Sequence, residues 1–334
     1  MVHLFFSTGP LHFIHIFEFI KKNKIKNYKI FMHKSKFNRV NSEMFNTIKF
    51  LDLKNIEVIS WNSIKILNFL NYITFIKKIR TKYSNIKITF VISDFKYLFF
   101  HFLRVTFTRS NFILIDEGSG TIIAYKKYIS RRIYFPVDQY KSGLFSVYKY
   151  LLTNNFRILL YSKFKIYSLY EDYNTDDDIL INNLEYVKKK IKRVIKKDNS
   201  LVLFVGTKLS ERGAIPLDDE LKILKNIKSY WSNRGKKLIY VAKRTSSDEK
   251  LNLIKKNLSI DYLKFSLPLE LAISKEFNKL PFAICSHGSA LDITLNKIYK
   301  IKSYLYFPKG YEKVFHLDHS KNYIIVSKSE IINI

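Results

Sequence analysis

The chain has 334 residues, enough for two domains at about 150 residues each. Hydrophobic residues make up 47% of it and charged residues 26%, so a large core can be buried and wholesale disorder is excluded. The 58 Lys and Arg residues outnumber the 28 Asp and Glu residues, giving a formal charge of +30. This excess predicts anionic partners, either nucleic acid, a phospholipid surface, or phosphorylated or carboxylated substrates, although AT-rich codons could account for part of the lysine.

The amino-terminal 20 residues are apolar, but they lack a basic region and a small-residue cleavage site, so we expect no signal peptide. No uninterrupted apolar run reaches the roughly 20 residues that cross a bilayer. The one cysteine, Cys285, excludes an intramolecular disulfide framework and fits a reducing compartment. We therefore expect a cytoplasmic protein, either soluble or held peripherally at the inner face of the membrane.

The first half of the chain alternates short β-rich runs with helical stretches, which predicts βα units on a parallel sheet. The expected strands are Val2–Phe6, Lys29–Met32, Ile56–Ile59, Ile88–Ile92 and Phe112–Ile115. The expected helices begin at Leu11 and include Ser63–Ile79 and Phe95–Val105.

The same rhythm begins again after a charged middle segment. The expected strands are Leu201–Val205, Lys237–Val241 and Phe282–Cys285, and the expected helices are Leu217–Asn233, Ser247–Asn257, Pro268–Phe277 and Ser289–Lys297. Two successive α/β halves predict two Rossmann-like domains facing a cleft, over residues 1–170 and 200–334. In such sheets ligands bind beyond the carboxyl ends of the strands.

Residues 171–199 form the expected linker between the domains. A helix over Tyr186–Lys197 would carry an aliphatic stripe among lysines, suited either to docking between the domains or to lying on an anionic membrane. The acidic residues Asp176, Asp177 and Asp178 offer a metal–diphosphate spacing, but directly before a helix they are more simply charges favoured by its dipole.

Two candidate motifs follow strands of the first half. Ser7, Thr8 and Gly9 form a loop after the first strand, with hydroxyls and a glycine available to a substrate. Asp116-Glu117-Gly118-Ser119 ends an apolar strand in two carboxyl groups, one of which can serve as a general base. Because adjacent side chains on an extended chain point opposite ways, we expect one carboxyl to reach the substrate and the other to support the loop.

Three more candidate motifs follow strands of the second half. Gly206-Thr207 can bring backbone N–H groups and a hydroxyl towards a phosphate. Lys243-Arg244 supplies two cations that can hold a phosphate, the Lys243 ammonium as a point charge and the Arg244 guanidinium as a planar, bidentate hydrogen-bond donor. Ser286-His287-Gly288-Ser289 begins a helix, which is an anion site, and His287 is a candidate proton donor. Simpler explanations are open as well: in a chain with 58 basic residues a Lys-Arg pair is common, and His287 could be a histidine with purely structural hydrogen bonds. Gly206-Thr207 lacks the spacing of a P-loop and is a weak signal by itself.

Together these segments resemble the bacterial sialyltransferases, above all the lipooligosaccharide sialyltransferases of glycosyltransferase family 52, with related features in families 38 and 80. The resemblance rests on the acidic-acidic-Gly motif at Asp116-Glu117-Gly118, on Gly206-Thr207, and on the serine motif from Ser286 to Ser289. One feature departs from the family: its His-Pro pair is absent, and Lys243-Arg244 stands in that region.

The resemblance implies a GT-B glycosyltransferase that transfers sialic acid from CMP-sialic acid to a hydroxyl of a lipooligosaccharide or capsular glycan, with inversion. Asp116 would be the base, and Lys243, Arg244 or His287 would assist the departing CMP. Ser7, Thr8, Gly9, Glu117, Gly118, Ser119, Gly206, Thr207, Ser286, Gly288 and Ser289 would bind substrate. No metal and no cofactor beyond the donor is implied, and an oligomer is possible.

Three other functions stay open. A GT-B enzyme using a different nucleotide sugar is suggested by the missing His-Pro pair. A nucleic-acid-binding protein is suggested by the charge and by an aromatic content of 16%, but the lysines are scattered and no binding motif is present, so we do not expect a nucleic-acid partner. A non-catalytic membrane scaffold would use the basic Tyr186–Lys197 helix.

Overall fold

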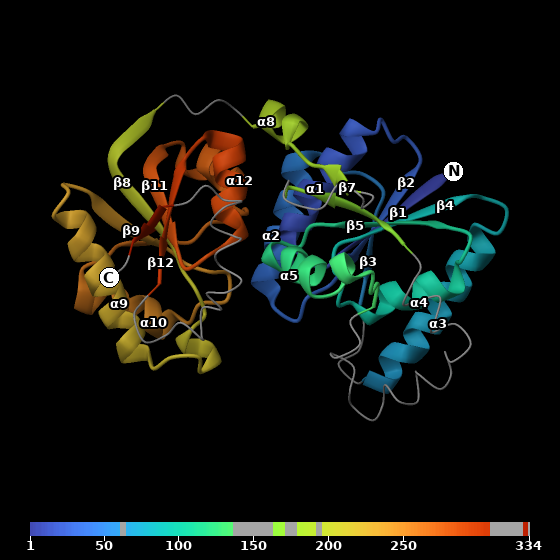
Figure 1. Ribbon diagram of the computed structural model, residues 1–334, viewed down its shortest axis with the longest axis horizontal. Coiled ribbons are helices and arrows are strands. Elements are labelled where there is room, and N and C mark those ends of the chain that lie inside the picture. Colours follow the sequence, from blue (N-terminus) through green and yellow to red (C-terminus); the bar gives the residue numbers. More distant parts are fainter. Residues whose placement is uncertain (61–64, 136–162, 171–178, 192–195, 308–329, 333–334) are drawn as a thin grey trace. The chain divides into compact units, whose positions relative to one another are not determined.

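The computed structural model describes residues 1–60, 65–135, 163–170, 179–191, 196–307 and 330–332. The chain forms two compact units, within which most residue contacts are made. The first unit comprises Met1–Lys36 and Thr47–Tyr186, and the second comprises Phe37–Asn46 and Val187–Ile334. Each unit is an α/β fold built on a parallel sheet (Figure 1), so the expected fold class is confirmed. The grouping of Phe37–Asn46 with the second unit had no signal in the sequence.

The first unit contains a parallel sheet whose described strands follow the order β3-β2-β1-β4-β5-β6-β7. The strands are β1 (Val2–Ser7), β2 (Tyr28–His33), β3 (Ile56–Ile59), β4 (Ile88–Ile92), β5 (Asn111–Ile115), β6 (Lys165–Ser168) and β7 (Ile179–Ile181). The helices are α1 (Pro10–Lys22), α3 (Lys65–Lys82), α4 (Leu98–Thr106) and α5 (Ser119–Lys127), followed by a 3-10 turn at Ile129–Arg131. Helix α2 (Asn38–Leu51) is divided: residues 38–46 group with the second unit and residues 47–51 with the first. The expected strands and helices are present here, with shifted ends.

An aromatic-rich core covers one face of this sheet. Alternate residues Leu4 and Phe6 of β1 and Phe90 of β4 pack there against α3 and α4, whose Phe75 and Phe99 are buried. Phe6 contacts Phe31, Phe75 and Phe99 at ring-centroid distances of 5.0, 6.1 and 5.4 Å. Burial of such rings fixes the strands whose carboxyl ends carry the candidate site.

The second unit repeats the design with the strand order β10-β9-β8-β11-β12-β13. Its strands are β8 (Lys197–Val205), β9 (Lys237–Val241), β10 (Tyr262–Leu263), β11 (Leu280–Ser286), β12 (Lys302–Tyr306) and β13 (Glu330–Ile332). Its helices are α9 (Leu217–Ser232), α10 (Asp248–Leu258), α11 (Leu269–Ala272), continued by a π turn at Ile273–Phe277, and α12 (Ala290–Tyr299), with a 3-10 turn at Ser210–Arg212. Val202 and Phe204 of β8 face α9 and α10, while Leu201 and Leu203 face α11 and α12. Both faces of this sheet are therefore covered by helices (Figure 1).

The basic linker helix is shorter than predicted. Helix α8 covers Glu185–Lys190, and the chain is already extended at Lys197, where β8 begins by pairing with Leu280 of β11. The predicted helix over Tyr186–Lys197 is therefore wrong at its carboxyl end. Its residues 192–195, and the acidic run at 176–178, lie outside the described residues. No helix in the described part of the chain is both long and apolar enough to cross a bilayer.

The strand order reverses once in each sheet, between β1 and β4 in the first unit and between β8 and β11 in the second. Ligands of open α/β sheets bind beyond the carboxyl ends of the strands at such reversals. Ser7–Gly9 follows β1, Gly206-Thr207 follows β8, and Ser286–Ser289 ends β11 and begins α12. The predicted motifs therefore lie where this fold builds its binding sites.

Candidate functional site

The loop after β1 is held by local hydrogen bonds. Ser7 is buried and its hydroxyl donates to the carbonyl of Gly9 at 3.1 Å, while the Thr8 N–H donates to Nδ1 of His12 at 3.1 Å. The Ser93 hydroxyl, after β4, donates to the carbonyl of Phe6 at 3.2 Å. The Ser7 hydroxyl is hydrogen-bonded within the loop, whereas Thr8 and Gly9 are half-buried and within reach of a ligand.

Asp116 is fully buried after β5 and ties that strand to β6. Its two carboxyl oxygens accept from the Ser168 hydroxyl at 2.9 Å and from the Leu169 N–H at 2.5 Å. A carboxylate with both oxygens engaged and no exposure cannot approach an acceptor hydroxyl in this arrangement. These contacts agree with the loop-supporting role expected of one carboxyl in this motif more than with the predicted role of Asp116 as base.

Glu117, the neighbouring carboxyl, is half-buried and interacts with Asp94 at the end of β4. Burial, the charge of Asp94 and a hydrogen bond between the two side chains raise the pKa of Glu117 to about 8. Two carboxyl groups joined by a hydrogen bond share a proton. Sequence reasoning missed Asp94, although its place after a buried strand was a usable signal.

Glycines make room for this carboxyl. Gly118 has φ +105°, a conformation that favours glycine. A Cβ on Gly120 would meet the Glu117 carboxyl, with Oε1 at 1.8 Å, so the glutamate side chain lies directly against the first turn of α5. The Glu117 N–H donates to Thr121 Oγ1 at 3.0 Å and completes the turn. Ser119 begins the helix, but its side chain is not described.

In the second unit, Gly206 lies against a buried ring. A Cβ on Gly206 would lie 2.4 Å from the Tyr240 hydroxyl oxygen, so the chain passes this close only because the residue is glycine. The Gly206 N–H donates to the carbonyl of Val241 at 2.9 Å. The loop that follows β8 is thereby held beside the end of β9.

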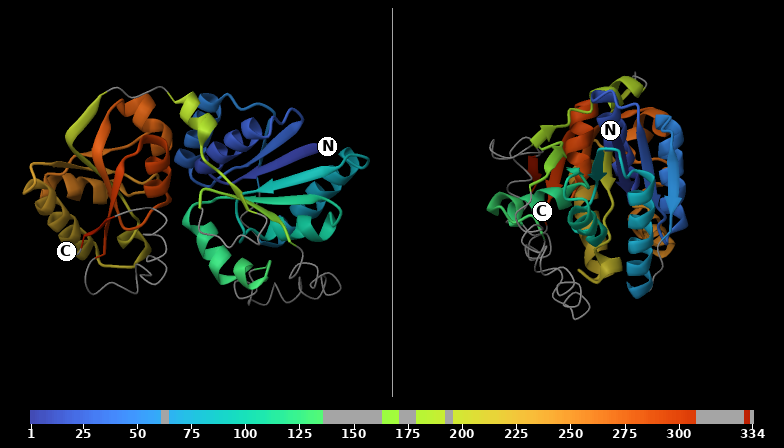
Figure 2. Two further views of the ribbon diagram at one scale, coloured as in Figure 1. Left: turned by 45° about the horizontal axis from the view of Figure 1, so that its top comes forward. Right: turned by 90° about the vertical axis from the view of Figure 1, so that its right-hand side faces the viewer.

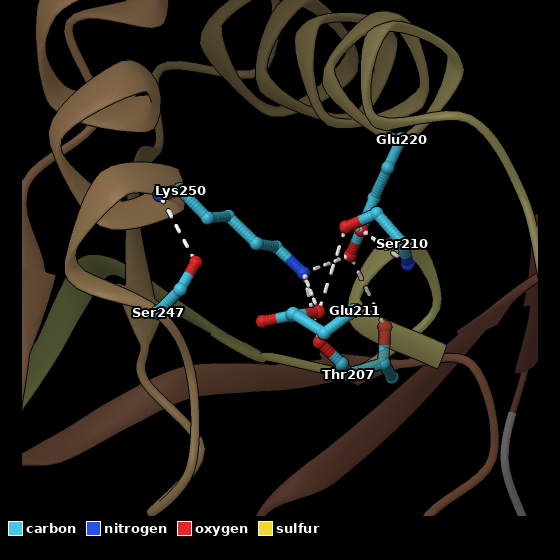
Figure 3. Close-up of polar contacts among 6 residues, drawn as sticks. All are labelled: Thr207, Ser210, Glu211, Glu220, Ser247 and Lys250. Atoms are coloured by element: carbon cyan, nitrogen blue, oxygen red, sulfur yellow. Dashed lines mark hydrogen bonds and ion pairs between the residues drawn. The ribbon is translucent and has the colours of Figure 1, made fainter. Parts of the chain in front are cut away.

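An ion-pair cluster around Lys250 also holds this loop (Figure 3). The Lys250 ammonium contacts Glu220 at 2.5 Å and Glu211 at 3.0 Å and donates to the carbonyl of Thr207 at 2.9 Å. Glu220 accepts from the Ser210 hydroxyl at 2.5 Å and from its N–H at 3.1 Å. Sequence reasoning missed the cluster because Lys250 belongs to a helix rich in exposed charges. The Thr207–Ser210 loop is therefore fixed by charged hydrogen bonds.

Four cations interact electrostatically beside this loop: Lys208, Arg212, Lys243 and Arg244. Partial desolvation and the positive charges of the other three lower the pKa of Lys243, with Glu211 opposing. Glu211 and, at Arg244, Glu43 neutralise part of this positive charge, and the remaining positive charge favours a bound anion. Two of the four, Lys243 and Arg244, were predicted from the sequence, and the other two follow from the fold.

Arg244 is also held by a buried acid. Its Nε lies 2.6 Å from Glu43, and burial raises the pKa of Glu43 to about 7 although Arg244 opposes the shift. Glu270, buried at the start of α11, accepts from the Thr294 hydroxyl at 3.0 Å. Its pKa is also raised by burial. Because its Nε is committed to Glu43, Arg244 is less free than Lys243 to bind a ligand.

The serine motif forms a helix cap. Ser286 is buried, donates to Asp292 at 2.7 Å and accepts from the Gly288 N–H at 2.9 Å. Ser289 caps α12 in a reciprocal arrangement with Asp292, whereas Gly288 is exposed at φ +89°. The cap explanation thus accounts for Ser286 and Ser289, while Gly288 is exposed.

His287 is a neutral side chain in this loop. Its Nδ1 donates to the carbonyl of Tyr306 at 2.7 Å, and its ring packs edge-on against Phe204 at 5.3 Å. Burial lowers its pKa, so the ring is unprotonated at neutral pH and Nε2 is an acceptor. This arrangement disfavours the predicted role of proton donor.

Among the described residues, no group of three or more His, Cys, Asp or Glu side chains is placed to hold a metal ion. No family model matches the chain, and no curated protein matches it in sequence. Similarity is found among solved structures. A protein from Listeria monocytogenes assigned as a UDP-N-acetylglucosamine 2-epimerase superposes with a TM-score of 0.60 at 9% identity, covering 99% of this chain and 91% of that one.

Two further similar structures belong to proteins with different named activities. The UDP-GlcNAc 2-epimerase of Methanocaldococcus jannaschii, in complex with UDP-GlcNAc and UDP, has a TM-score of 0.54 at 12% identity and covers 91% of this chain and 83% of its own. A sialyltransferase from Photobacterium damsela has a TM-score of 0.51 at 11% identity, with coverages of 100% and 81%. The fold is of the GT-B type. At these identities the likeness concerns the fold alone.

Proposed function

We propose that this chain is a nucleotide-sugar-dependent glycosyltransferase, with CMP-sialic acid as donor and a hydroxyl of a cell-surface glycan or glycolipid as acceptor. The observation that carries the proposal is the cluster of Lys208, Arg212, Lys243 and Arg244 beside the fixed loop after β8. A nucleotide phosphate is the anion expected at this edge of such a sheet. The donor itself is proposed from the resemblance of the motifs to family 52.

In the proposed reaction the acceptor oxygen bonds to the anomeric carbon as the bond to the CMP oxygen breaks, and CMP leaves with that electron pair. Lys243 stabilises the charge that develops on the phosphate. The acceptor proton passes to the Glu117 carboxylate. A pKa of about 8 makes that carboxylate more basic than an ordinary one, yet leaves part of it ionised near neutral pH. Asp116 positions the loop.

The Asp94–Glu117 pair also favours a second candidate, epimerisation of a UDP-sugar. Inverting a carbon that bears hydrogen requires removal of its proton while the electron pair of the C–H bond forms a double bond and expels the nucleotide. A proton then returns as the nucleotide adds back, and a carboxyl pair sharing a proton can both remove and return one. The structural similarity to proteins named as UDP-GlcNAc 2-epimerases agrees with this alternative.

Incubation of the purified chain with CMP-sialic acid and with UDP-GlcNAc in D2O, followed by proton and phosphorus NMR, separates the two candidates. Transfer predicts release of CMP from CMP-sialic acid and its loss in Lys243→Gln. Epimerisation instead predicts deuterium at the sugar carbon of UDP-GlcNAc without release of UDP. If neither nucleotide sugar is consumed, with acceptor glycans present or absent, both proposals fail.

Attachment to the inner membrane face would bring such an enzyme to a glycolipid acceptor. We propose that the protein is cytoplasmic, attaches peripherally to this face and can form an oligomer. The net charge of +30 agrees with peripheral attachment.

A further inference from the structure

A pocket of about 410 Å³ lies in the first unit at the amino ends of β4 and β5. This edge of the sheet is opposite to the one that carries Glu117, because all strands here run parallel. Figure 2 shows the amino ends of the first strands gathered at the side marked N. Three cations line the pocket: Arg80, Lys87 and Arg109.

The starts of two paired strands bring these cations to one pocket. Lys87 directly precedes β4, and Arg109 lies in the turn before β5, whose Asn111 pairs with Thr89 of β4. Arg80 comes from the last turn of α3, which precedes β4. Three cations around one pocket give it a positive potential, which attracts an anionic ligand.

No carboxylate in the described part of the chain neutralises these cations. The pocket lining contains no Asp or Glu. None of the three cations has an ion-pair partner within the described ranges. Glu57, a carboxylate that influences the lining residue Tyr83, is already paired with Lys29 at 3.4 Å and with Lys78 at 2.8 Å. All three pocket cations are exposed and able to bind a ligand.

Hydroxyl groups accompany the cations. Ser84, Thr108 and Ser110 line the same pocket, and each can donate a hydrogen bond to an anionic oxygen. Guanidinium forks combined with an ammonium and hydroxyls suit phosphate oxygens. The volume exceeds that of a bare ion and lies within the range of small-ligand sites.

We propose that this pocket binds the phosphate group of a ligand other than the nucleotide. The ligand is either a soluble phosphorylated molecule or a phospholipid headgroup, which present the same oxygens. The site is on the first unit and the proposed nucleotide cluster is on the second, so this inference stands whether or not the proposed function holds.

The test compares two triple variants that remove equal charge. Arg80→Gln with Lys87→Gln and Arg109→Gln neutralises the pocket. The control, Lys225→Gln with Lys255→Gln and Lys256→Gln, neutralises exposed helix lysines of the second unit. The probes are inorganic pyrophosphate in calorimetric titrations and phosphatidylcholine vesicles with or without phosphatidylglycerol in sedimentation.

We expect pyrophosphate to protect residues 80–88 and 106–111 from hydrogen exchange, and its affinity for this site to fall at least about tenfold in the pocket variant only. If the pocket variant also fails to sediment with phosphatidylglycerol vesicles while the control still does, the bound phosphate group belongs to a lipid. If vesicle binding is equal in both, the source is a soluble phosphate. Protection confined to the second unit, or an equal loss of pyrophosphate affinity in both triples, would overturn the proposal.

Discussion

The ammonium of Lys250 lies 2.5 Å from Oε1 of Glu220, with the two side chains only 1% and 3% exposed. Glu220 in turn binds Ser210, and Lys250 binds the carbonyl of Thr207. This pair therefore connects helices α9 and α10 to the loop that the proposed function assigns to the nucleotide phosphate.

Replacing Lys250 by Met is expected to destabilise the second unit by about 3–5 kcal/mol, because Glu220 is left buried without its counter-charge. Denaturant unfolding measures this loss. Adding Glu220→Gln should recover part of it. Lys222→Met, which removes an exposed partner 3.3 Å from Asp219, serves as control and should cost less than about 1 kcal/mol. Equal losses in Lys250→Met and in this control would contradict the role of the buried pair.

Gly206→Ala should destabilise the second unit by about 1–3 kcal/mol, because the new Cβ would overlap the Tyr240 ring. Gly9→Ala is the matched control. Its Cβ would meet His12 at an ordinary 3.7 Å and its φ is −160°, so thermal unfolding should change little. A Gly206→Ala chain as stable as Gly9→Ala would mean that the approach to Tyr240 is not restrictive.

The raised pKa of Glu117 makes stability depend on pH. A carboxyl that binds its proton more tightly when folded stabilises the fold below its ordinary pKa of 4.5, and that contribution is lost as pH rises through about 8. Glu117→Gln removes this dependence. As pH rises from 5 to 8, the denaturant midpoint of the variant should therefore increase relative to that of the wild type. Glu43, with a pKa near 7, contributes in the same direction in both proteins. Parallel pH profiles for Glu117→Gln and the wild type would rule out the shift.

Asp94→Asn should lower the pKa of Glu117, because the charge of Asp94 and its hydrogen bond both raise it. Carbon NMR of the labelled carboxyl, recorded from pH 4 to pH 9, measures the change directly. Lys78→Gln, a change at an exposed cation paired with Glu57, is the control and should leave the titration of Glu117 in place. An unmoved midpoint in Asp94→Asn would show that the two carboxyls are not coupled.

The alternation of apolar strands and helices was enough to predict both sheets, because parallel strands buried on both faces have distinctive apolar runs. The shortest strands gave no such signal: β10 has two residues and β7 has three. The helix expected to reach Lys197 ends earlier, since pairing with β11 extends β8 to that residue. Tertiary pairing here overrides the local helical pattern.

The positions of the site motifs could also be predicted, but not the division of roles within them. Asp116 and Glu117 point opposite ways in any extended chain, and only Ser168 and Leu169, more than fifty residues later, determine which one is buried. Likewise Lys250 looks like any surface lysine until α9 brings Glu220 against it. Contacts between residues so far apart produce no periodic pattern in the sequence from which they could be predicted.

Calorimetric titration with CMP tests the central claim, that the second unit binds a nucleotide phosphate, most directly. The account predicts saturable binding to the wild type and to the control Lys225→Gln, weakened at least about tenfold in Lys243→Gln, as expected for loss of one charge-assisted hydrogen bond. Absence of saturable binding by CMP and by UDP, or an unchanged Kd in Lys243→Gln, would contradict it.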